Sequence, residues 1–341
     1  MSHRELTFER LEKCPLCGTE NHSFYDECPD SLVNDINRSL PADVDQLPQI
    51  NNVRRKCTEC GLIFLSPRLD KVSLPIIYEY WYKYAYTSVF YDELLIHNRL
   101  QQFRKYHLST LNDNATTRNT LLDVGCGSGL FMKVAQESGW SVVGVEFDQK
   151  TAEAGKEAYG VEIRCGTIDS SIKDNETFDA ITLFDYLEHS STPAEDLQLL
   201  IRHLNEDGVL LVRVPNMKGW QSKFMGCGWL AVISNHLSYF SEDALKKHLE
   251  SLGLEVIEVS AVNYQTEADI LSQRWNWLKS KLQRTSTASQ QTVPQLRSGE
   301  MKDGVFSAIR RLLYSLLIEQ VDHAGGLFNK GNNLMIVARK R

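Results

Sequence analysis

Residues 120–132, TLLDVGCGSGLFM, constrain the fold of this chain more than any other segment. The segment opens with an apolar run that is too short for a helix and is followed by glycines, as expected for a buried parallel strand. Gly125, Gly127 and Gly129 permit a tight turn whose backbone N–H groups can approach a ligand closely. Apolar residues then recur at helical spacing from Leu130, so the turn is predicted to open a helix. This strand, turn and helix predict an α/β fold with a nucleotide-type ligand at the turn.

A second predicted strand runs from Ser141 to Val145 and is followed by the acid Glu146. A carboxylate at this strand end can accept hydrogen bonds from both hydroxyls of an adenosine ribose. The dinucleotide fingerprint is G-x-G-x-x-G, but here the third glycine comes one residue early and Asp123 precedes the turn. An NAD site and an ordinary strand–turn–helix remain open as alternatives at this point.

The alternation of strands and helices continues along the chain. Further strands are predicted at 161–164, 178–184, 208–214, 254–262 and 333–339, with helices at 151–159, 193–204 and 242–252. Parallel strands joined by right-handed crossovers give a doubly wound, mostly parallel sheet of seven strands. Ligands of such sheets bind at the carboxyl ends of the strands. Gly125, Glu146, Asp169 and Asp185 all fall at such ends, which indicates one nucleoside site.

Two C-x-x-C pairs mark the N-terminal part: Cys14 with Cys17, and Cys57 with Cys60. Each pair is followed by glycine, as in a zinc knuckle, where two thiolates project from a tight turn. Two knuckles complete a closed tetrahedral site for a structural zinc ion, because no coordination position stays open. The alternatives are two unrelated turns, or a redox pair, which usually lies beside a βαβ pattern. The residues between the pairs, 19–56, are expected to be loop in part.

The net charge and the cysteine pattern indicate which partners and which cellular compartment to expect. The formal net charge of -7 argues mildly against a polyanion as the main partner. No apolar run is long enough to span a bilayer, and residues 1–10 lack an apolar signal segment, so a cytoplasmic location is expected. In a reducing compartment C-x-x-C pairs indicate metal binding rather than disulfides. Cys28, Cys165 and Cys227 are expected to be plain small side chains.

Three parts are predicted along the chain: a zinc-ribbon module at 1–68, a helical cap or connector at 69–118, and an α/β domain at 119–341. A cluster of aromatic residues within the connector is expected to pack in the core, or else to close over the ligand. The α/β domain should carry a helical insertion at about 264–330. Its amphipathic helix, 305–321, is expected to pack on the domain; dimerisation or peripheral membrane contact stays open. The oligomeric state is not predicted.

The order of motifs resembles a known family. The motifs are Cys14-Pro-Leu-Cys17, Cys57-Thr-Glu-Cys60-Gly-Leu-Ile-Phe, Leu122-Asp-Val-Gly-Cys-Gly-Ser-Gly, Leu187-Glu-His, Val214-Pro-Asn and His236-Leu-Ser-Tyr-Phe-Ser. Together they look like zinc-ribbon-containing class I S-adenosylmethionine-dependent methyltransferases of surface-glycan and natural-product pathways. The resemblance implies S-adenosylmethionine as cofactor and a structural zinc. The implied cofactor-binding residues are Asp123, Gly125, Cys126, Gly127, Gly129, Glu146, Phe147, Asp169, Asp185 and Tyr186.

Methyl transfer to a hydroxyl or an activated carbon requires a base that takes the proton of the nucleophile. His236, on the loop after the fifth strand, is the first candidate, and its match in the resembled enzymes is their base. Glu188 and His189, directly after the fourth strand, are the other catalytic candidates. An unperturbed histidine pKa near ~6.5 suits a base at neutral pH. The alternative for either histidine is a polar residue that fixes a loop.

The loop around His236 also bears on the substrate. Sugar C-methyltransferases read Tyr-x-Glu-His-Leu-Ser-Tyr-Phe-Ser there, whereas this chain has Ile233 and Asn235 in place of the tyrosine and glutamate. We therefore expect O-methylation of a small molecule or glycan intermediate in a biosynthetic pathway. C-methylation of a nucleotide-linked deoxysugar is the first alternative. RNA methylation guided by the zinc ribbon is the second, and nucleic acid is an unlikely partner given the net charge. A non-enzymatic scaffold is the third, against which the intact glycine loop counts.

Overall fold

The computed structural model describes residues 6–41, 44–81, 83, 93–229, 231–262 and 331–341. The predicted insertion at 264–330, with its helix at 305–321, lies outside the described residues, as do residues 82 and 84–92 of the connector with their aromatic side chains. Within the described part, the strands form a seven-stranded, a four-stranded and a two-stranded sheet.

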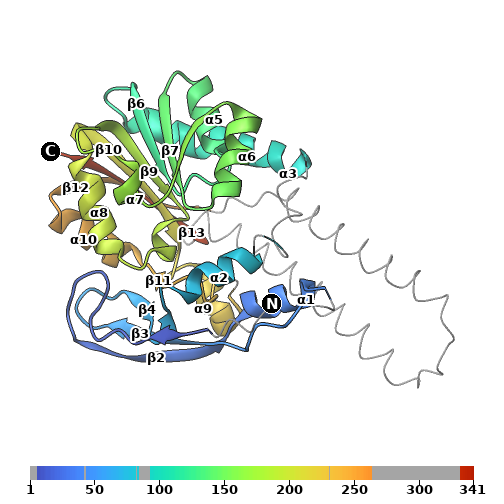
Figure 1. Ribbon diagram of the computed structural model, residues 1–341. Coiled ribbons are helices and arrows are strands. Elements are labelled where there is room, and N and C mark those ends of the chain that lie inside the picture. The colour runs from blue at the N-terminus through green and yellow to red at the C-terminus, as the bar shows by residue number, and fades with distance from the viewer. Residues whose placement is uncertain (1–5, 42–43, 82, 84–92, 230, 263–330) are drawn as a thin grey trace, which may run out of the picture.

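The largest sheet carries the predicted α/β core. Its strands are β6 (Thr120–Val124), β7 (Ser141–Glu146), β8 (Glu162–Cys165), β9 (Phe178–Phe184), β10 (Leu204–Pro215), β12 (Leu254–Val262) and β13 (Asn333–Lys340). They lie in the order β12-β13-β10-β9-β6-β7-β8, and β13 runs antiparallel to both of its neighbours while the other pairs are parallel. The mostly parallel seven-stranded sheet is therefore confirmed (Figure 1). The strand order reverses between β6 and β9, which is where such sheets bind ligands.

Helices cover both faces of this sheet, because each central strand is apolar on both sides. On one face pack α8 (Pro193–Arg202) and α10 (Glu242–Ser251), whose buried residues share a core with Leu122. On the other face pack α5 (Leu130–Glu137) and α4 (Ser109–Asn114), in a core that includes the next strand residue back, Leu121. The helix α6 (Gln149–Tyr159) follows β7, and the short α7 (Ile168–Ser171) follows β8.

Helices make up most of the described connector. It consists of α2 (Ser73–Tyr80), α3 (Glu93–Gln102), a π-helical turn η2 (Phe103–Leu108) and α4. Leu108 and Leu111 pack under the sheet with Phe131 of α5, which ties the connector to the α/β core. No helix within the described residues combines the length and the hydrophobicity needed to cross a bilayer.

The N-terminal module is built on an antiparallel sheet of β2 (His22–Pro29), β3 (Asn51–Cys57) and β4 (Ile63–Leu65). A fourth strand, β11 (Ser238–Tyr239), comes from the loop that follows β10 in the α/β domain. A small ladder of β1 (Phe8–Glu9) and β5 (Arg68–Leu69) flanks this sheet. Between the knuckles, β2 is followed by the helix α1 (Ser31–Ser39) and then by β3, so only part of this segment is loop. Because β11 belongs to the α/β domain and pairs with β4, this sheet contains strands from both the N-terminal module and the α/β domain.

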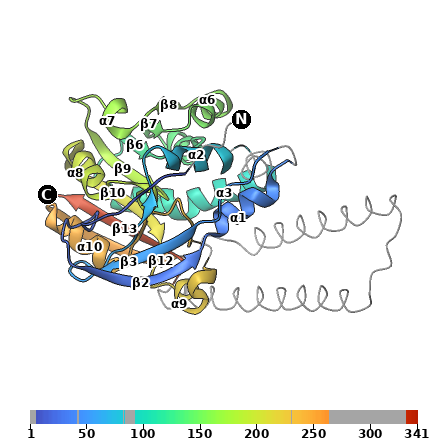
Figure 2. The same ribbon diagram turned by 60° about the horizontal axis from the view of Figure 1, so that its bottom comes forward.

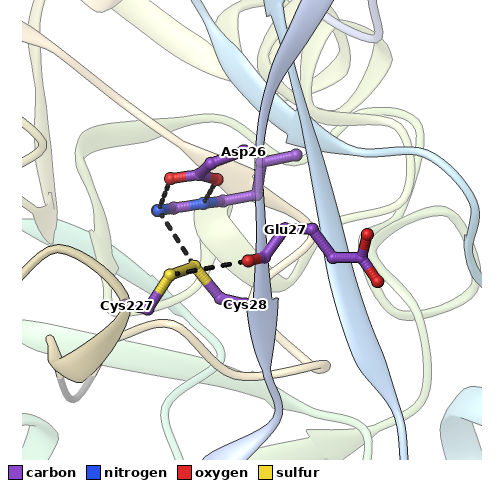
Figure 3. The surroundings of a disulfide bond; sticks show 5 residues. Asp26, Glu27, Cys28 and Cys227 are labelled. Atoms are coloured by element: carbon purple, nitrogen blue, oxygen red, sulfur yellow. Dashed lines mark hydrogen bonds and ion pairs between the residues drawn. A yellow bond between two sulfur atoms is a disulfide. The ribbon is translucent and has the colours of Figure 1, made fainter.

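The expectation that Cys28 and Cys227 are plain small side chains was wrong. The two cysteines form a disulfide across a sequence separation of 199 residues (Figure 3). Cys28 lies on β2, and Cys227 lies in the turn η4 (Gly226–Gly228) that follows α9 (Trp220–Met225). Figures 1 and 2 both show α9 beside β2, so the fold places the two thiols in contact. Cys165 is exposed and free.

Candidate active site

The glycine loop leads from β6 into α5. Gly125, Gly127 and Gly129 have φ angles of 68°, 54° and 77°, in the left-handed region that favours glycine. A Cβ added at Gly125 would lie 2.8 Å from Cδ2 of Tyr186, whereas one at Gly127 would meet nothing within 4 Å. Gly125 is therefore required by close packing as well as by its conformation. The N–H groups of Gly125 and Cys126 donate to the carbonyl of Val145, and that of Gly129 donates to the carbonyl of Cys126, so these hydrogen bonds fix the loop at the carboxyl end of β6.

Glu146 ends β7 and closes the glycine loop from the opposite side. Its side chain is only 8% exposed, and Oε2 accepts a hydrogen bond from the backbone N–H of Gly127 at 2.9 Å. Oε1 accepts one from the N–H of Asp148, also at 2.9 Å. Burial raises the pKa of Glu146, although these two hydrogen bonds oppose the shift. The carboxylate thus fixes two loops at the predicted ribose position.

Asp123 precedes the glycine loop inside the sheet. The side chain is buried, and Oδ1 accepts a hydrogen bond of 2.6 Å from the hydroxyl of Thr182 on β9. Burial raises the pKa of Asp123 to about 7, with the hydrogen bond from Thr182 acting in the opposite direction. Asp123 therefore links the two strands between which the strand order reverses.

This shift predicts a pH dependence of stability. The folded-state pKa of Asp123 lies above its unfolded value, so between pH 4 and 7 the unfolded chain binds fewer protons at this group, and stability falls as the pH rises. Asp123→Asn abolishes this titration. From pH 5 to pH 8, the free energy of unfolding of the variant should therefore rise by about 2–3 kcal/mol relative to the wild type. Urea denaturation across this range tests the effect, with Glu153→Gln on the exposed face of α6 as control; parallel pH profiles would contradict it.

The other predicted cofactor-binding residues lie along the same sheet edge. Phe147 follows Glu146 and is 62% exposed, and Asp169 is exposed in the first turn of α7. Cys126 is half-buried within the glycine loop. Asp185 has a φ of 55° and pairs with Arg213, and the hydroxyl of Tyr186 donates to Asp196 at 2.9 Å. The structure thus places these residues at the ends of β6 to β9, while their contacts with a cofactor stay predicted.

Two loops bring the three catalytic candidates together. Glu188 and His189 form the turn η3 (Leu187–His189) after β9, and His236 precedes β11. One potential metal-binding atom from each residue lies within 4.8 Å of the others, and the imidazole centroids are 4.6 Å apart. Nδ1 of His189 lies 2.8 Å from the carbonyl of Asn235, and Nδ1 of His236 lies 2.9 Å from that of Ala231. Nδ1–H must donate in each contact, which leaves the lone pair on Nε2.

The protonation of this cluster follows from its burial. Burial lowers the pKa of His189. Burial and the neighbouring imidazole of His189 hold the pKa of His236 well below its usual value. Burial likewise raises the pKa of Glu188 well above its usual range. Both imidazoles are therefore neutral at physiological pH, and each is a weaker base than the unperturbed histidine expected from the sequence.

Two residues at the site had no distinct sequence signal. Tyr78 was grouped with the packing aromatic residues, but its hydroxyl lies 3.0 Å from Nδ1 of His189. Gly155 lies inside α6, where a Cβ would come within 2.4 Å of the carbonyl oxygen of Ser128. This glycine lets α6 approach the glycine loop, and a glycine within a predicted helix was the only available hint.

The four knuckle cysteines converge beside the N-terminal sheet. Sγ of Cys14 lies 3.6 Å from Sγ of Cys60, and Sγ of Cys17 lies 3.6 Å from Sγ of Cys57. A tetrahedron with Zn–S bonds of about 2.3 Å has sulfur–sulfur edges of about 3.8 Å. The hydrogen bond with Cys60 lowers the pKa of Cys14 to about 5. The spacing fits a tetrahedral four-thiolate metal site.

The sequence of this chain is similar to a protein family and to several enzymes. Residues 94–259 match the family model of the Methyltransferase domain. The ubiquinone biosynthesis O-methyltransferase of Rhodopseudomonas palustris (strain BisB5) is 25% identical over 185 residues, which are 50% of this chain and 71% of the relative. The enzyme of the same name from Nitrobacter winogradskyi is 27% identical over 186 residues, 51% of this chain and 69% of the relative.

The structure was also compared with solved structures. The crystal structure of a SAM dependent methyltransferase from Archaeoglobus fulgidus matches with a TM-score of 0.46 and 15% sequence identity, over 71% of this chain and 94% of that chain. The segment matched by the family model contains the glycine loop, Glu146 and the Glu188, His189 and His236 cluster. The four knuckle cysteines lie outside it.

Proposed function

We propose that this chain, an S-adenosylmethionine-dependent methyltransferase, methylates a hydroxyl oxygen of a small molecule or glycan intermediate in a biosynthetic pathway. The observation that carries the proposal is the pair of neutral imidazoles of His189 and His236 beside the carboxyl edge of the sheet. The O-methyltransferase activity named for both curated relatives supports an oxygen acceptor.

The donor would be held by the glycine loop and Glu146. The fit rests on two features: the left-handed glycines form the tight turn expected of such a loop, and the carboxylate of Glu146 is fixed by the N–H groups of Gly127 and Asp148. Phe147 and Asp169, both exposed at this edge, would contact the adenine. The bound donor supplies an electrophilic methyl carbon on its sulfonium.

The acceptor would lie between the donor and the histidine cluster. His236 would take the hydroxyl proton on Nε2, and the bound donor would supply the methyl group for the new O–C bond and leave as the neutral thioether. Nδ1–H of His236 stays bonded to the carbonyl of Ala231, which holds the ring in the tautomer that a base needs. The hydroxyl of Tyr78 lies within hydrogen-bond distance of His189 and helps to position that ring.

C-methylation of a nucleotide-linked deoxysugar is the second candidate. It is favoured by the run from His236 to Ser241, which matches the loop of sugar C-methyltransferases. Asn235, in the place of their glutamate, is buried, and its backbone carbonyl contacts His189. An amide cannot take up a proton as a carboxylate can, so this position favours an oxygen acceptor.

Transfer of a labelled methyl group tests the proposed function. Full-length protein and methyl-labelled S-adenosylmethionine are incubated with sugar nucleotides, phenolic and aliphatic natural-product hydroxyls, and RNA. We expect label in a hydroxyl-bearing small molecule. Label in RNA alone, or in no acceptor of any class while the donor binds, would overturn the proposal.

We also propose that the knuckle cysteines hold a structural zinc. The four sulfur atoms lie within 4.8 Å of one another and come from two turns with the spacing of zinc knuckles. Cys14 and Cys57 are also part of the apolar core that joins the N-terminal module to the α/β domain. The ion would therefore stabilise this junction, while the reaction takes place elsewhere. A cytoplasmic location stays a prediction.

Loss of the ion should unfold the module selectively. Freshly purified, reduced protein should hold one zinc in this site, and Cys57→Ser should lose it, because structural zinc contributes directly to folding. Hydrogen exchange should then accelerate in β2 and β3 far more than in β9 and β10. Cys165→Ser, at an exposed cysteine outside the cluster, is the matched control. Elemental analysis that finds no zinc in the wild type would contradict the proposal that these cysteines hold zinc.

A further inference from the structure

Glu188, His189 and His236 also combine the side-chain types of a metal site. Two imidazoles and one carboxylate form a common ligand set for divalent transition metals. One potential ligand atom from each residue lies within 4.8 Å of the other two, although the residues come from the separate loops after β9 and β10. Three protein ligands leave at least one coordination position open for an oxygen of a substrate.

The surrounding hydrogen bonds prepare both imidazoles for binding. His189 donates from Nδ1 to the carbonyl of Asn235, and His236 donates from Nδ1 to that of Ala231. Metal-binding histidines almost always make such a contact with their second nitrogen, because it fixes the ring and the tautomer. Nε2 of each ring carries the lone pair, and no hydrogen bond from a described residue occupies it. A backbone hydrogen bond of 2.7 Å from Leu237 to the carbonyl of Glu188 ties the two loops together.

Glu188 provides an independent indication of a cation. The residue is 1% exposed, and Oε2 has no hydrogen-bond partner among the described residues. A buried carboxylate without a partner is costly, and a bound cation removes that cost. The side-chain charges that act on Glu188 are those of Asp185 and Arg213, which form an ion pair with each other.

We propose that Glu188, His189 and His236 bind a divalent transition-metal ion of the Co²⁺, Ni²⁺ or Zn²⁺ class. Two imidazoles favour these ions over Mg²⁺ and Ca²⁺, which prefer oxygen ligands. The role of the ion rests on the proposed function: it would bind the acceptor oxygen, lower the pKa of the hydroxyl and let its proton pass to water. The oxygen then attacks the methyl carbon as the carbon–sulfur bond breaks. When the ion is bound, His236 is a metal ligand and does not act as the base. The ion then promotes the loss of the hydroxyl proton.

Cobalt binding to the full-length, zinc-loaded protein tests the site. Co²⁺ at the cluster should give weak visible bands, without the sulfur-to-cobalt charge-transfer absorption that would mark exchange into the four-cysteine site. We expect one such Co²⁺ per chain. Glu188→Gln and His236→Ala should each weaken its binding at least ~10-fold. His248→Ala, at a partly buried histidine on α10 outside the cluster, is the matched control and should bind Co²⁺ as the wild type does.

The outcomes separate this inference from the proposed function. Absence of Co²⁺ bands, or unchanged affinity in both cluster variants while S-adenosylmethionine still binds, would overturn the metal site. Cobalt binding without methyl transfer to any hydroxyl would support the metal site and overturn the proposed function. O-methylation at an unchanged rate in protein that retains the four-cysteine zinc but lacks any second ion would overturn the catalytic role of the ion.

Discussion

Replacing Glu146 with alanine is expected to weaken S-adenosylmethionine binding by about 1.5–3 kcal/mol, a loss of roughly 10- to 160-fold. Two effects combine. The variant lacks a charged acceptor for the ribose hydroxyls, and it also leaves the N–H groups of Gly127 and Asp148 without the carboxylate that joins them. The glycine loop therefore loses its support at the same time. Isothermal titration calorimetry with S-adenosylmethionine and S-adenosylhomocysteine measures the change.

The controls for this variant separate binding from folding. Glu146→Gln keeps an acceptor oxygen and should fall between the wild type and the alanine variant. Glu153→Gln, an exposed change on α6, should leave affinity unaltered. Unchanged affinity in Glu146→Ala, or tighter binding of NAD than of S-adenosylhomocysteine to the wild type, would contradict the assignment of the donor site.

Replacing His236 with alanine should lower kcat by about 10²-fold or more. The ring contacts His189 and the carbonyl of Ala231, in the region where we propose that the acceptor binds. Because these contacts involve neither the glycine loop nor Glu146, the affinity for S-adenosylmethionine should be nearly unchanged. Steady-state kinetics with an identified acceptor, together with donor titration, measure both quantities.

His248→Ala is the matched control for His236→Ala. Burial lowers the pKa of His248, as it does for His236, but His248 lies on α10 away from the cluster. This control should keep the wild-type kcat. Full activity in His236→Ala would show that His236 only fixes a loop, and an equal loss in both variants would point to a general effect on folding.

The strands and helices of the α/β core could be predicted because the hydrophobic pattern of each one lies within a short stretch of the chain. The strand β9 was predicted with its observed bounds, since a run of apolar residues ending at Asp185 marks a buried parallel strand. The helix predicted at 242–252 is observed as α10, and the side chain of Ser241 caps it by accepting from the N–H of Ala244. The acids and glycines at the strand ends likewise follow from local sequence.

Contacts between distant segments could not be predicted in this way. The loop that carries His236 is held beside His189 by the pairing of β11 with β4 and by the hydrogen bond from Leu237 to Glu188. A strand of two residues has no periodicity that reveals its partner. The disulfide between Cys28 and Cys227 depends on the same junction, and neither cysteine has a nearby partner that would suggest it. These pairings follow from tertiary structure alone.

The central claim is that the methyl group goes to oxygen at the Glu188, His189 and His236 cluster. The most direct measurement is NMR of the product formed from S-adenosylmethionine with a ¹³C-labelled methyl group. We predict a labelled signal in the methoxy region that correlates with a carbon bearing the former hydroxyl. A labelled methyl bonded to carbon would contradict this account and support C-methylation instead.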